Sequence, residues 1–459
     1  MRGIWSTIAL VLVLAGLGAY IYFVDSSKTS PGMEPKEKVF AVESDKINEV
    51  RITAGGETTA LVKKDTGWSV TEPIATEADP TESASLVTNI ASMEQTRVVE
   101  EKAADLAPYG LKEPRIKVAF KAEGNVSGEV FIGDTTPMQG DIYATKPGST
   151  KVFLVSSFIE TTFNKRPFDL RDKRVVKFDR DKVDSLELTR GGDTIHLTRA
   201  GDAWVVDAPM KGRGDYAAVE GLLTRLSTAG MASIVEDKAG DLKSVGLDSP
   251  FMRIVVGLGS SRAALEIGRP EGDSSYARDT SRPLVFTLDK TLTDDLTKPF
   301  EQYHKKELFE SRAFSMERVK ITRRVDGTPK TWEFVKTKGA DADKWQVKSE
   351  GGQPTDADAA KVDALLNALG GLRLGAFAAP TARTGMDAPV LSAAVSYDGG
   401  KFERVRVGTA GDRFYGNREG EQATGELDKT AVDGVLQALD AALAPPAPPT
   451  APAAPTAKP

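Results

Sequence analysis

The sequence predicts an α+β protein in which an N-terminal transmembrane helix precedes three tandem repeats. Each repeat is expected to be a mostly antiparallel sheet with one main capped helix and a short second helix. Two observations lead to this prediction. The chain begins with an uncharged apolar run from Ile4 to Val24. Short motifs then recur three times, in one order and at nearly constant spacing, which is the signature of a repeated structural unit.

Composition excludes several classes of function. The 459 residues are 40% hydrophobic and 27% charged, a balance typical of globular proteins. The net charge of −6 does not suggest nucleic acid, which requires a concentrated basic face. The chain has no cysteine, so disulfides, thiolate nucleophiles and cysteine-ligated metals are excluded. The two histidines, His196 and His304, belong to no zinc motif such as HExxH. No cofactor or metal is expected.

Residues 1–25 are expected to form the transmembrane anchor. A helix from Ile4 to Val24 would span about 30 Å, one hydrocarbon core. A cleaved signal peptide is the alternative, but its apolar region is usually about 7–15 residues long and ends in a small-x-small site. This run is longer and ends in aromatic residues, Tyr20, Tyr22 and Phe23, which suit a membrane interface. Arg2 favours a cytoplasmic N-terminus and an extracytoplasmic, periplasmic location for the rest of the chain.

The other boundaries follow from composition and from the repeat. Residues 26–38 are polar and contain prolines, so they are expected to form a spacer. The three repeats are assigned to residues 39–175, 176–312 and 313–444. Residues 445–459 contain seven prolines and five alanines, which predicts a disordered tail that cannot build a core.

Each repeat opens with short strands, one of which carries the motif Trp-x-Val. Its tryptophans are Trp68, Trp204 and Trp345, which are 136 and 141 residues apart. Side chains alternate along a strand, so the tryptophan and the valine share one face. Burial of that pair should contribute several kcal/mol, by the area rule.

A capped helix follows the strands. The three aspartates Asp79, Asp215 and Asp358 each stand seven residues before a pair of apolar residues, with a further apolar residue four positions after the first of the pair. The spacing i, i+1, i+4 defines one helix face. Aspartate at this distance is suited to be the N-cap. A repeated catalytic acid is the alternative, and capping explains the pattern better.

A glycine motif follows the helix, in DLAPYGLKEP, DLKSVGLDSP and ARTGMDAP. Its glycines are Gly110, Gly246 and Gly385. Glycine accepts the left-handed conformation that closes a helical turn, and the proline that follows begins a strand. An Ile/Val-Gly pair and a tyrosine recur further along each repeat. The motif is therefore interpreted as a structural turn.

These motifs, together with the connector Asp169-Leu-Arg-Asp-Lys-Arg-Val-Val-Lys-Phe178, resemble the bacterial family known as domain of unknown function 4340. The resemblance covers about residues 39–443 and is weaker in the third repeat. It implies a membrane-anchored extracytoplasmic protein, often encoded beside components of gliding-type ABC transporters. It implies no activity, cofactor or catalytic residue, so it names no site.

Few residues are candidates for chemistry. His196 alternates with Ile195 and Leu197, which predicts a surface position on a strand. His304 lies between the second and third repeats and has no evident counterpart after the first. Trp332 could stack on a ligand, but it is expected to pack with Phe334. No nucleophile, base and orienting group occur together, so an enzyme is not expected.

The connector between the first two repeats is the candidate partner-binding segment. From Lys165 to Lys177 it holds six basic and two acidic residues. Such a patch could bind an anionic partner, a lipid headgroup or a wall polymer, and the alternative is a solvated link with local ion pairs. The candidate contacts are Arg166, Arg171, Lys173, Arg174 and Lys177.

The expected function is that of a non-enzymatic scaffold of a bacterial envelope complex, anchored in the inner membrane and working through protein partners. Association with an ABC transporter is implied by the resemblance alone. A module that binds peptidoglycan or polysaccharide in a cleft between repeats is the alternative, and a hydrolase is the third choice. Exposed aromatic residues in a groove between repeats would favour the glycan hypothesis. A flat apolar or charged patch would favour a protein partner.

Overall fold

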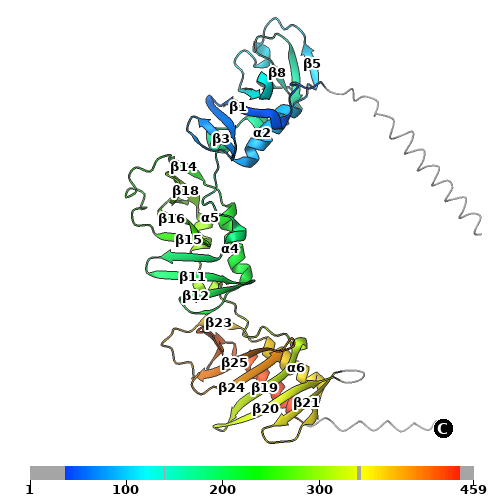
Figure 1. The fold of residues 1–459 in the computed structure, drawn as a ribbon, viewed down its shortest axis with the longest axis vertical. Coiled ribbons are helices and arrows are strands. Elements are labelled where there is room, and N and C mark those ends of the chain that lie inside the picture. Colours follow the sequence, from blue (N-terminus) through cyan, green and yellow to red (C-terminus); the bar gives the residue numbers. More distant parts are fainter. Residues whose placement is uncertain (1–36, 139, 339–342, 445–459) are drawn as a thin grey trace, which may run out of the picture. The chain divides into compact units, whose positions relative to one another are not determined.

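The computed structural model describes residues 37–138, 140–338 and 343–444 (Figure 1). They form three similar nine-stranded antiparallel sheets, each accompanied by helices. The predicted α+β class is therefore confirmed. The apolar run 4–24, most of the spacer and the tail 445–459 lie outside the described residues. Within the described part of the chain, no helix has both the length and the apolar character that crossing a membrane requires.

The first sheet has the strand order β4-β3-β2-β1-β6-β7-β8-β9-β5. Its helices are α2 (Pro80–Ser92) and α3 (Phe158–Phe163), with short 3-10 turns at η2 (Ser44–Lys46) and η5 (Pro167–Leu170). The strands are β1 (Ile47–Ala54), β2 (Glu57–Lys64), β3 (Gly67–Glu72), β4 (Thr76–Glu77), β5 (Arg97–Glu100), β6 (Ile116–Ala122), β7 (Val126–Thr135), β8 (Asp141–Thr145) and β9 (Val152–Ser156).

The second sheet repeats this order as β13-β12-β11-β10-β15-β16-β17-β18-β14. Helices α4 (Tyr216–Thr228) and α5 (Lys290–Leu296) lie together on one face of it (Figure 1). The strands are β10 (Ser185–Arg190), β11 (Asp193–Ala200), β12 (Ala203–Ala208), β13 (Gly212–Arg213), β14 (Ser233–Glu236), β15 (Met252–Leu258), β16 (Ser261–Glu271), β17 (Ser274–Asp279) and β18 (Val285–Asp289).

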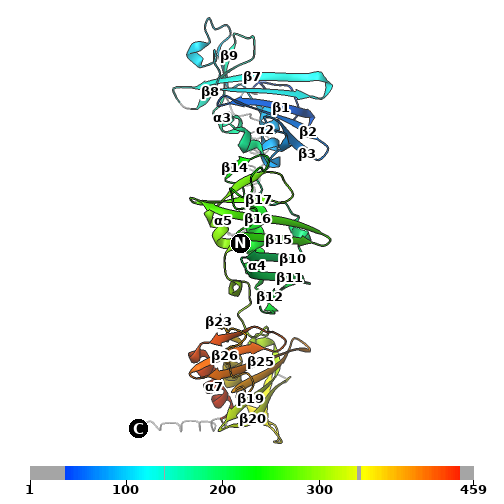
Figure 2. The ribbon, with the colours of Figure 1, turned by 90° about the vertical axis from the view of Figure 1, so that its left-hand side faces the viewer.

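The third sheet has the equivalent order β22-β21-β20-β19-β24-β25-β26-β27-β23. Its helices are α6 (Ala359–Gly370) and α7 (Lys429–Leu443), and α7 is visible beside β26 in Figure 2. The strands are β19 (Met316–Val325), β20 (Thr328–Thr337), β21 (Lys344–Ser349), β22 (Thr355–Ala357), β23 (Leu374–Phe377), β24 (Leu391–Tyr397), β25 (Lys401–Ala410), β26 (Arg413–Arg418) and β27 (Thr424–Leu427).

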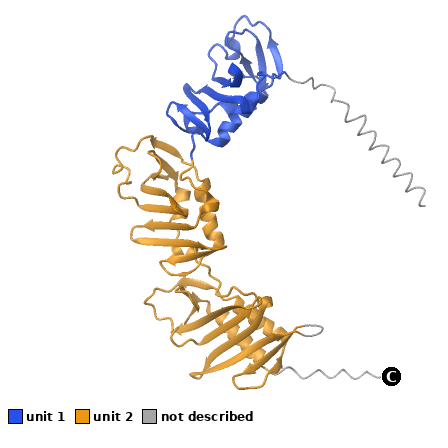
Figure 3. Cartoon of the chain, in the orientation of Figure 1, with its two compact units in different colours: residues 1–173 blue, residues 174–459 orange. Residues whose placement is uncertain are grey.

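The chain divides into two compact units at the bond between Lys173 and Arg174 (Figure 3). The first unit holds the first sheet, and the second unit holds the other two.

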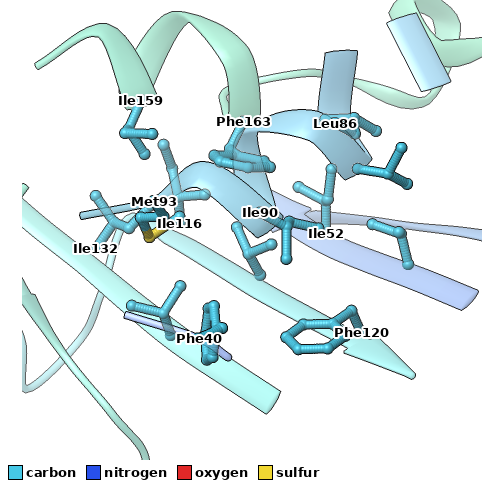
Figure 4. Packing of buried hydrophobic residues seen from close by; sticks show 14 of the residues in the cluster. Phe40, Ile52, Leu86, Ile90, Met93, Ile116, Phe120, Ile132, Ile159 and Phe163 are labelled. Atoms are coloured by element: carbon cyan, nitrogen blue, oxygen red, sulfur yellow. The ribbon is translucent and has the colours of Figure 1, made fainter. Parts of the chain in front are cut away.

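Each core lies between a sheet and its helices. In the first repeat, Leu86 and Ile90 of α2 and Phe163 of α3 meet Ile52 and Phe120 of the sheet (Figure 4). All five side chains are at most 4% exposed. Burial of one such side chain contributes about 1.5–3 kcal/mol, so the i, i+1, i+4 face predicted from sequence is the face that holds the helix to the sheet.

The Trp-x-Val motif lies on β3, β12 and β21. Trp204 and Trp345 are buried, whereas Trp68 is only half-buried against the core of its repeat. The indole N–H of Trp204 donates to Glu220 on α4 at 3.0 Å, which joins the strand to the helix that it supports.

The recurring aspartates cap the helices. Each side chain accepts hydrogen bonds from backbone N–H groups in the first turn, at 2.9–3.4 Å. This satisfies donors that would otherwise have no partner in the helix. The capped pairs are Asp79 with α2, Asp215 with α4 and Asp358 with α6. The recurring glycines Gly110, Gly246 and Gly385 have φ of +65°, +70° and +69°, the left-handed conformation that the sequence predicts.

The prediction of a short second helix is wrong for the third repeat. Helix α3 has six residues and α5 has seven, but α7 has 15. After α3 and α5 the chain enters a connector whose Leu170 or Tyr303 is buried in the core. In the third repeat, two additional helical turns bring Leu439 and Ala442 into the core instead. The extension therefore supplies apolar side chains that a connector supplies elsewhere.

Candidate functional site

The first connector pairs with an edge strand of its own unit. The N–H of Asp79 donates to the carbonyl of Leu170 at 2.9 Å, just beyond the end of β4. The N–H of Asp172 donates in turn to the carbonyl of Glu77 at 3.0 Å. The connector thus adds a short extended segment to the edge of the sheet, which hides backbone groups that an edge strand would otherwise expose.

The second connector does the same within the second unit. The N–H of Asp215 donates to the carbonyl of Tyr303 at 2.7 Å. The N–H of Lys305 donates to the carbonyl of Arg213 on β13 at 2.9 Å. Two connectors of different sequence therefore cover two equivalent sheet edges with the same pair of hydrogen bonds.

This equivalence corrects the interpretation of His304. Gly214 forms an isolated β-bridge with His304, as Ala78 does with Arg171, so His304 does have a counterpart in the first connector. The imidazole is 1% exposed and lies beside the rings of Phe300 and Phe377, with ring centroids 5.7 and 4.9 Å away. Burial lowers the pKa of His304 to about 4, against a hydrogen bond to the Met210 backbone that acts to raise it. His304 is therefore a neutral, packed side chain at pH 7.

An ion-paired joint, made by Arg213, Glu310 and Glu421, holds the second connector to β13 and to the loop between β26 and β27. The Arg213 guanidinium contacts Glu310 at 2.6 Å and Glu421 at 2.5 Å, and it donates to the carbonyl of Glu307 at 2.6 Å. Burial acts to raise the pKa of Glu310, but hydrogen bonds from Lys305 and Arg213 outweigh it and lower this pKa to about 2. Glu310 is therefore ionised at neutral pH.

The carboxylate of Glu403 fixes the backbone of the second connector at Glu310 and Ser311. The Glu403 side chain is completely buried. It accepts the backbone N–H groups of Glu310 and Ser311 at 2.8 and 2.9 Å and pairs with Arg418. Burial opposes its ionisation, but these hydrogen bonds lower the pKa of Glu403. A buried charge is tolerated only when it is paired in this way, so Glu403 has a structural role.

A groove of about 1310 Å³ opens beside this joint, between the second and third repeats of the second unit. Its lining includes the charged or polar side chains of Arg213, Lys336, Asp363 and Asn367. It also includes two exposed aromatic rings, which are 56% exposed at Tyr216 and 76% at Phe314. A concave surface with aromatic rings and a few polar groups is typical of ligand-binding sites.

Both aromatic residues depart from the repeat pattern. Tyr216 is the first residue of α4, where α2 has Pro80 and α6 has Ala359. Phe314 is the middle residue of the 3-10 turn η8 (Ala313–Ser315). The equivalent turns, η2 and η6 (Arg180–Lys182), carry an aspartate there. Exposed rings at positions that are otherwise small or polar are not needed for the fold.

The residues predicted to bind a partner fall on both sides of the unit boundary. Arg166, Arg171 and Lys173 belong to the first unit, and Arg174 and Lys177 belong to the second. The Lys173 ammonium lies over the Phe168 ring, 5.6 Å from its centroid, and Arg171 is half-buried. Arg166 and Arg174 are exposed. Part of the connector is therefore held by local contacts, and its role in partner binding stays a prediction.

The remaining candidates do not form a reactive site. His196 lies on β11 with its Nδ1 atom 3.5 Å from a carboxylate oxygen of Asp207, and its side chain is 38% exposed. Trp332 packs against the core of the third repeat, together with the buried Phe334. Residues 37–138, 140–338 and 343–444 contain no group of three or more histidine, aspartate and glutamate side chains that could hold a metal ion.

Sequence reasoning missed the joint and the groove. Arg213, Glu310 and Glu421 lie far apart along the chain, and none of them belongs to a recognisable motif. A signal did exist for Tyr216 and Phe314, because each replaces a small or polar residue at a position that the repeat defines.

The fold and the site define a tandem-repeat α+β protein whose connectors cover sheet edges and whose second unit carries a groove with exposed aromatic rings. The chain belongs to the family described as Domain of unknown function (DUF4340), whose model matches residues 68–205 and 204–389. These matches reach into all three repeats, and the description assigns no activity.

No curated protein matches the chain. A DNA polymerase sliding clamp from Pseudomonas aeruginosa, solved with a ligand, is 10% identical in an alignment that covers 85% of this chain and 93% of the clamp, with a TM-score of 0.15. A second sliding clamp from the same organism, bound to griselimycin, is 10% identical over 86% of this chain and 94% of that one, with a TM-score of 0.14. Scores this low carry no argument about fold or function.

Proposed function

We propose that this chain is a non-enzymatic binding and scaffold protein of the bacterial envelope. Residues 4–24 hold it in the cytoplasmic membrane with the N-terminus inside, and the repeats lie on the extracytoplasmic side. The main support for the proposal is the way the two connectors bind the sheets. Each of the two connectors is bound as an extended segment on a sheet edge, which is a general mode of protein recognition.

The roles of the recurring residues support a non-enzymatic function. The aspartates cap helices, the glycines form turns, and Glu310 and Glu421 beside the groove are held in ion pairs with Arg213. A reactive carboxylate would need a pKa near the working pH, whereas the pKa of Glu310 is lowered to about 2. On the family resemblance alone, we further propose that the partner complex includes an ABC transporter.

Photo-crosslinking in cells tests the scaffold proposal. A photoreactive side chain is placed at Phe314 in the groove of the full-length chain, and a second version carries it at Phe402, which is also exposed but lies on β25. We expect discrete adducts with envelope proteins from the groove position. Adducts at neither position, together with no co-purified membrane protein, would contradict a scaffold.

The groove supports a second candidate function, the binding of peptidoglycan or polysaccharide. Tyr216 and Phe314 are exposed in a concave surface, and the polar side chains of Asp363 and Asn367 also line it. A concave surface with exposed aromatic rings favours a glycan ligand, whereas a flat patch would favour a protein partner.

Co-sedimentation with purified peptidoglycan tests this candidate. The double variant Tyr216→Ala, Phe314→Ala should reduce the bound fraction, since each ring contributes stacking area. Phe402→Ala should leave it unchanged. Equal sedimentation of the wild type and both variants would exclude the groove as a glycan site.

A further inference from the structure

The first repeat exposes two large apolar side chains close to each other. Met138 lies in the loop between β7 and β8 and is 92% exposed. Phe158 is the first residue of α3 and is 63% exposed. The N–H of Ser157 donates to the carbonyl of Gly140 at 3.4 Å, so the start of α3 lies against this loop. The two side chains therefore belong to one surface, the Met138–Phe158 patch.

The patch departs from the repeat pattern. Five residues join β7 to β8, whereas two residues form the equivalent turns of the other repeats, Gly272-Asp273 and Gly411-Asp412. The equivalent helices α5 and α7 begin with Lys290 and Lys429, where α3 has Phe158. The fold therefore needs no apolar side chain at either position, which indicates that the patch serves a contact.

The described chain begins beside this patch. The carbonyl of Glu37, the first described residue, accepts the N–H of Gln95 at 2.8 Å. The residue after Gln95, Thr96, has its hydroxyl oxygen 3.4 Å from a carboxylate oxygen of Asp141. Asp141 is the first residue of β8, where the loop that carries Met138 ends. The patch and the point where the chain enters the first repeat therefore lie at the same end of the sheet.

We propose that the Met138–Phe158 patch inserts into the outer leaflet of the cytoplasmic membrane. The inference rests on the proposed function, which places the membrane segment at residues 4–24. The twelve residues 25–36 join that segment to Glu37, and twelve residues reach at most about 40 Å. The patch is therefore held near the bilayer, whose boundary between headgroups and acyl chains accepts exposed apolar side chains.

The membrane segment makes so small a contact effective. Two side chains bury too little area to hold a soluble protein on a membrane. Attachment to the membrane segment makes their insertion intramolecular, which raises the effective concentration of lipid at the patch. The contact therefore orients the first repeat on the membrane, whereas the membrane segment retains the chain there.

A charged cluster beside the patch does not favour anionic lipids. Arg115 pairs with Glu160 of α3 at 2.7 Å, and it lies 3.6 Å from a carboxylate oxygen of Asp134 on β7. Two carboxylates and one guanidinium give this cluster a net charge of −1, which repels anionic headgroups. Insertion should therefore occur in zwitterionic lipid and should not depend on salt.

Site-specific fluorescence in nanodiscs tests the proposal. The chain has no cysteine, so a single introduced cysteine is labelled uniquely. Pro137→Cys places an environment-sensitive dye beside Met138 in the full-length chain, which is reconstituted in phosphatidylcholine nanodiscs that contain nitroxide-labelled lipid. Ser127→Cys is the control, because Ser127 lies eight residues before the end of β7, about 26 Å away. We expect about twofold or more stronger quenching at residue 137, since inserted side chains lie about 5–10 Å deep.

Substitutions in the patch complete the test. The double variant Met138→Ser, Phe158→Ser should lower the quenching at residue 137 to the level at residue 127. Val126→Ser, at another exposed apolar residue of the first repeat, should leave it unchanged. Equal quenching at the two labels, or a double variant that is quenched like the wild type, would overturn the proposal.

Two further outcomes separate the patch from the anchor. A dye at residue 137 that is shielded from aqueous iodide but not quenched by lipid would show that other residues of the chain cover the patch, which also overturns the proposal. A chain that enters nanodiscs without lipid quenching at residue 137 refutes the contact and leaves the membrane anchor standing. A chain that does not enter nanodiscs refutes both.

Discussion

The carbonyl of Val245 lies against Gly268 so closely that a Cβ atom has no room. The same contact joins Tyr109 to Gly133 and Thr384 to Gly408. In the second repeat, the N–H of Arg269 also donates to the carbonyl of Val245 at 3.0 Å. The turn glycine and the Ile/Val-Gly pair of each repeat thus belong to one structural feature, in which the backbone of the turn packs directly on a strand. This contact explains why both motifs recur together.

Gly268→Ala should therefore destabilise the second unit by about 2 kcal/mol or more, because the backbone must shift to admit the methyl group. Gly221→Ala is the control. Gly221 lies in helix α4, where an added Cβ meets nothing within 4 Å, so this change should stabilise by about 0.5–1 kcal/mol. Denaturant unfolding of both variants measures the difference. If Gly268→Ala stabilised the protein, as Gly221→Ala is expected to, the backbone would relieve the close contact at Gly268 at little cost in free energy.

The stability contributed by the ion pair between Arg213 and Glu310 should depend on pH. The folded pKa of Glu310, about 2, is below its ordinary value of 4.5. Its stabilisation is then fully present above about pH 4.5 and is lost as the pH falls through about 2. Glu310→Gln should cost about 1 kcal/mol at pH 7, the upper range for a partly exposed pair, and progressively less below pH 4. Unfolding measured at several pH values tests this, and a constant cost down to pH 2 would contradict it.

His304 should contribute a separate pH dependence. Its folded pKa, about 4, lies below the ordinary 6.5. The neutral, buried imidazole contributes stability above about pH 6.5 that is lost as the pH falls through about 4, up to about 3 kcal/mol. His304→Phe, which cannot titrate, should remove this slope. If the variant keeps the wild-type loss of stability between pH 6.5 and 4, another group is responsible.

Neither histidine should be needed for biological function. His196 is a half-exposed strand residue, and His304 packs between rings. Plasmid-borne His196→Ala and His304→Phe should each complement a deletion strain. A variant that folds and reaches the membrane, yet behaves like the deletion, would reveal a chemical site at that histidine and would refute the scaffold proposal.

The topology can be tested directly. If residues 4–24 anchor the chain with its N-terminus inside, protease added to spheroplasts should degrade residues 26–459. The mature protein should also retain its original N-terminal segment. Complete protection, or a mature N-terminus beyond residue 24, would contradict the predicted anchor.

Much of this fold could be predicted because the interactions that define it are local. The N-cap at Asp215 reaches only three residues along the chain, and the positive φ at Gly246 is a property of one residue. The i, i+1, i+4 pattern of α4 likewise arises within a few residues. Three repetitions of each signal made the period, and therefore the three repeats, visible in the sequence alone.

The site depended on contacts between distant residues. Arg213 meets Glu310 and Glu421 across about one hundred and two hundred residues, and no spacing in the sequence reveals which charges will pair. The equivalence of His304 and Arg171 became evident only from their β-bridges, which each residue forms with the corresponding edge of its own repeat. The two side chains are chemically unlike, so the sequence did not reveal it. The sequence by itself determined the repeating unit, through short-range backbone and side-chain preferences. Only the tertiary structure decided which edges are covered, which charges are buried and which aromatic rings stay exposed, because these depend on how distant segments pack.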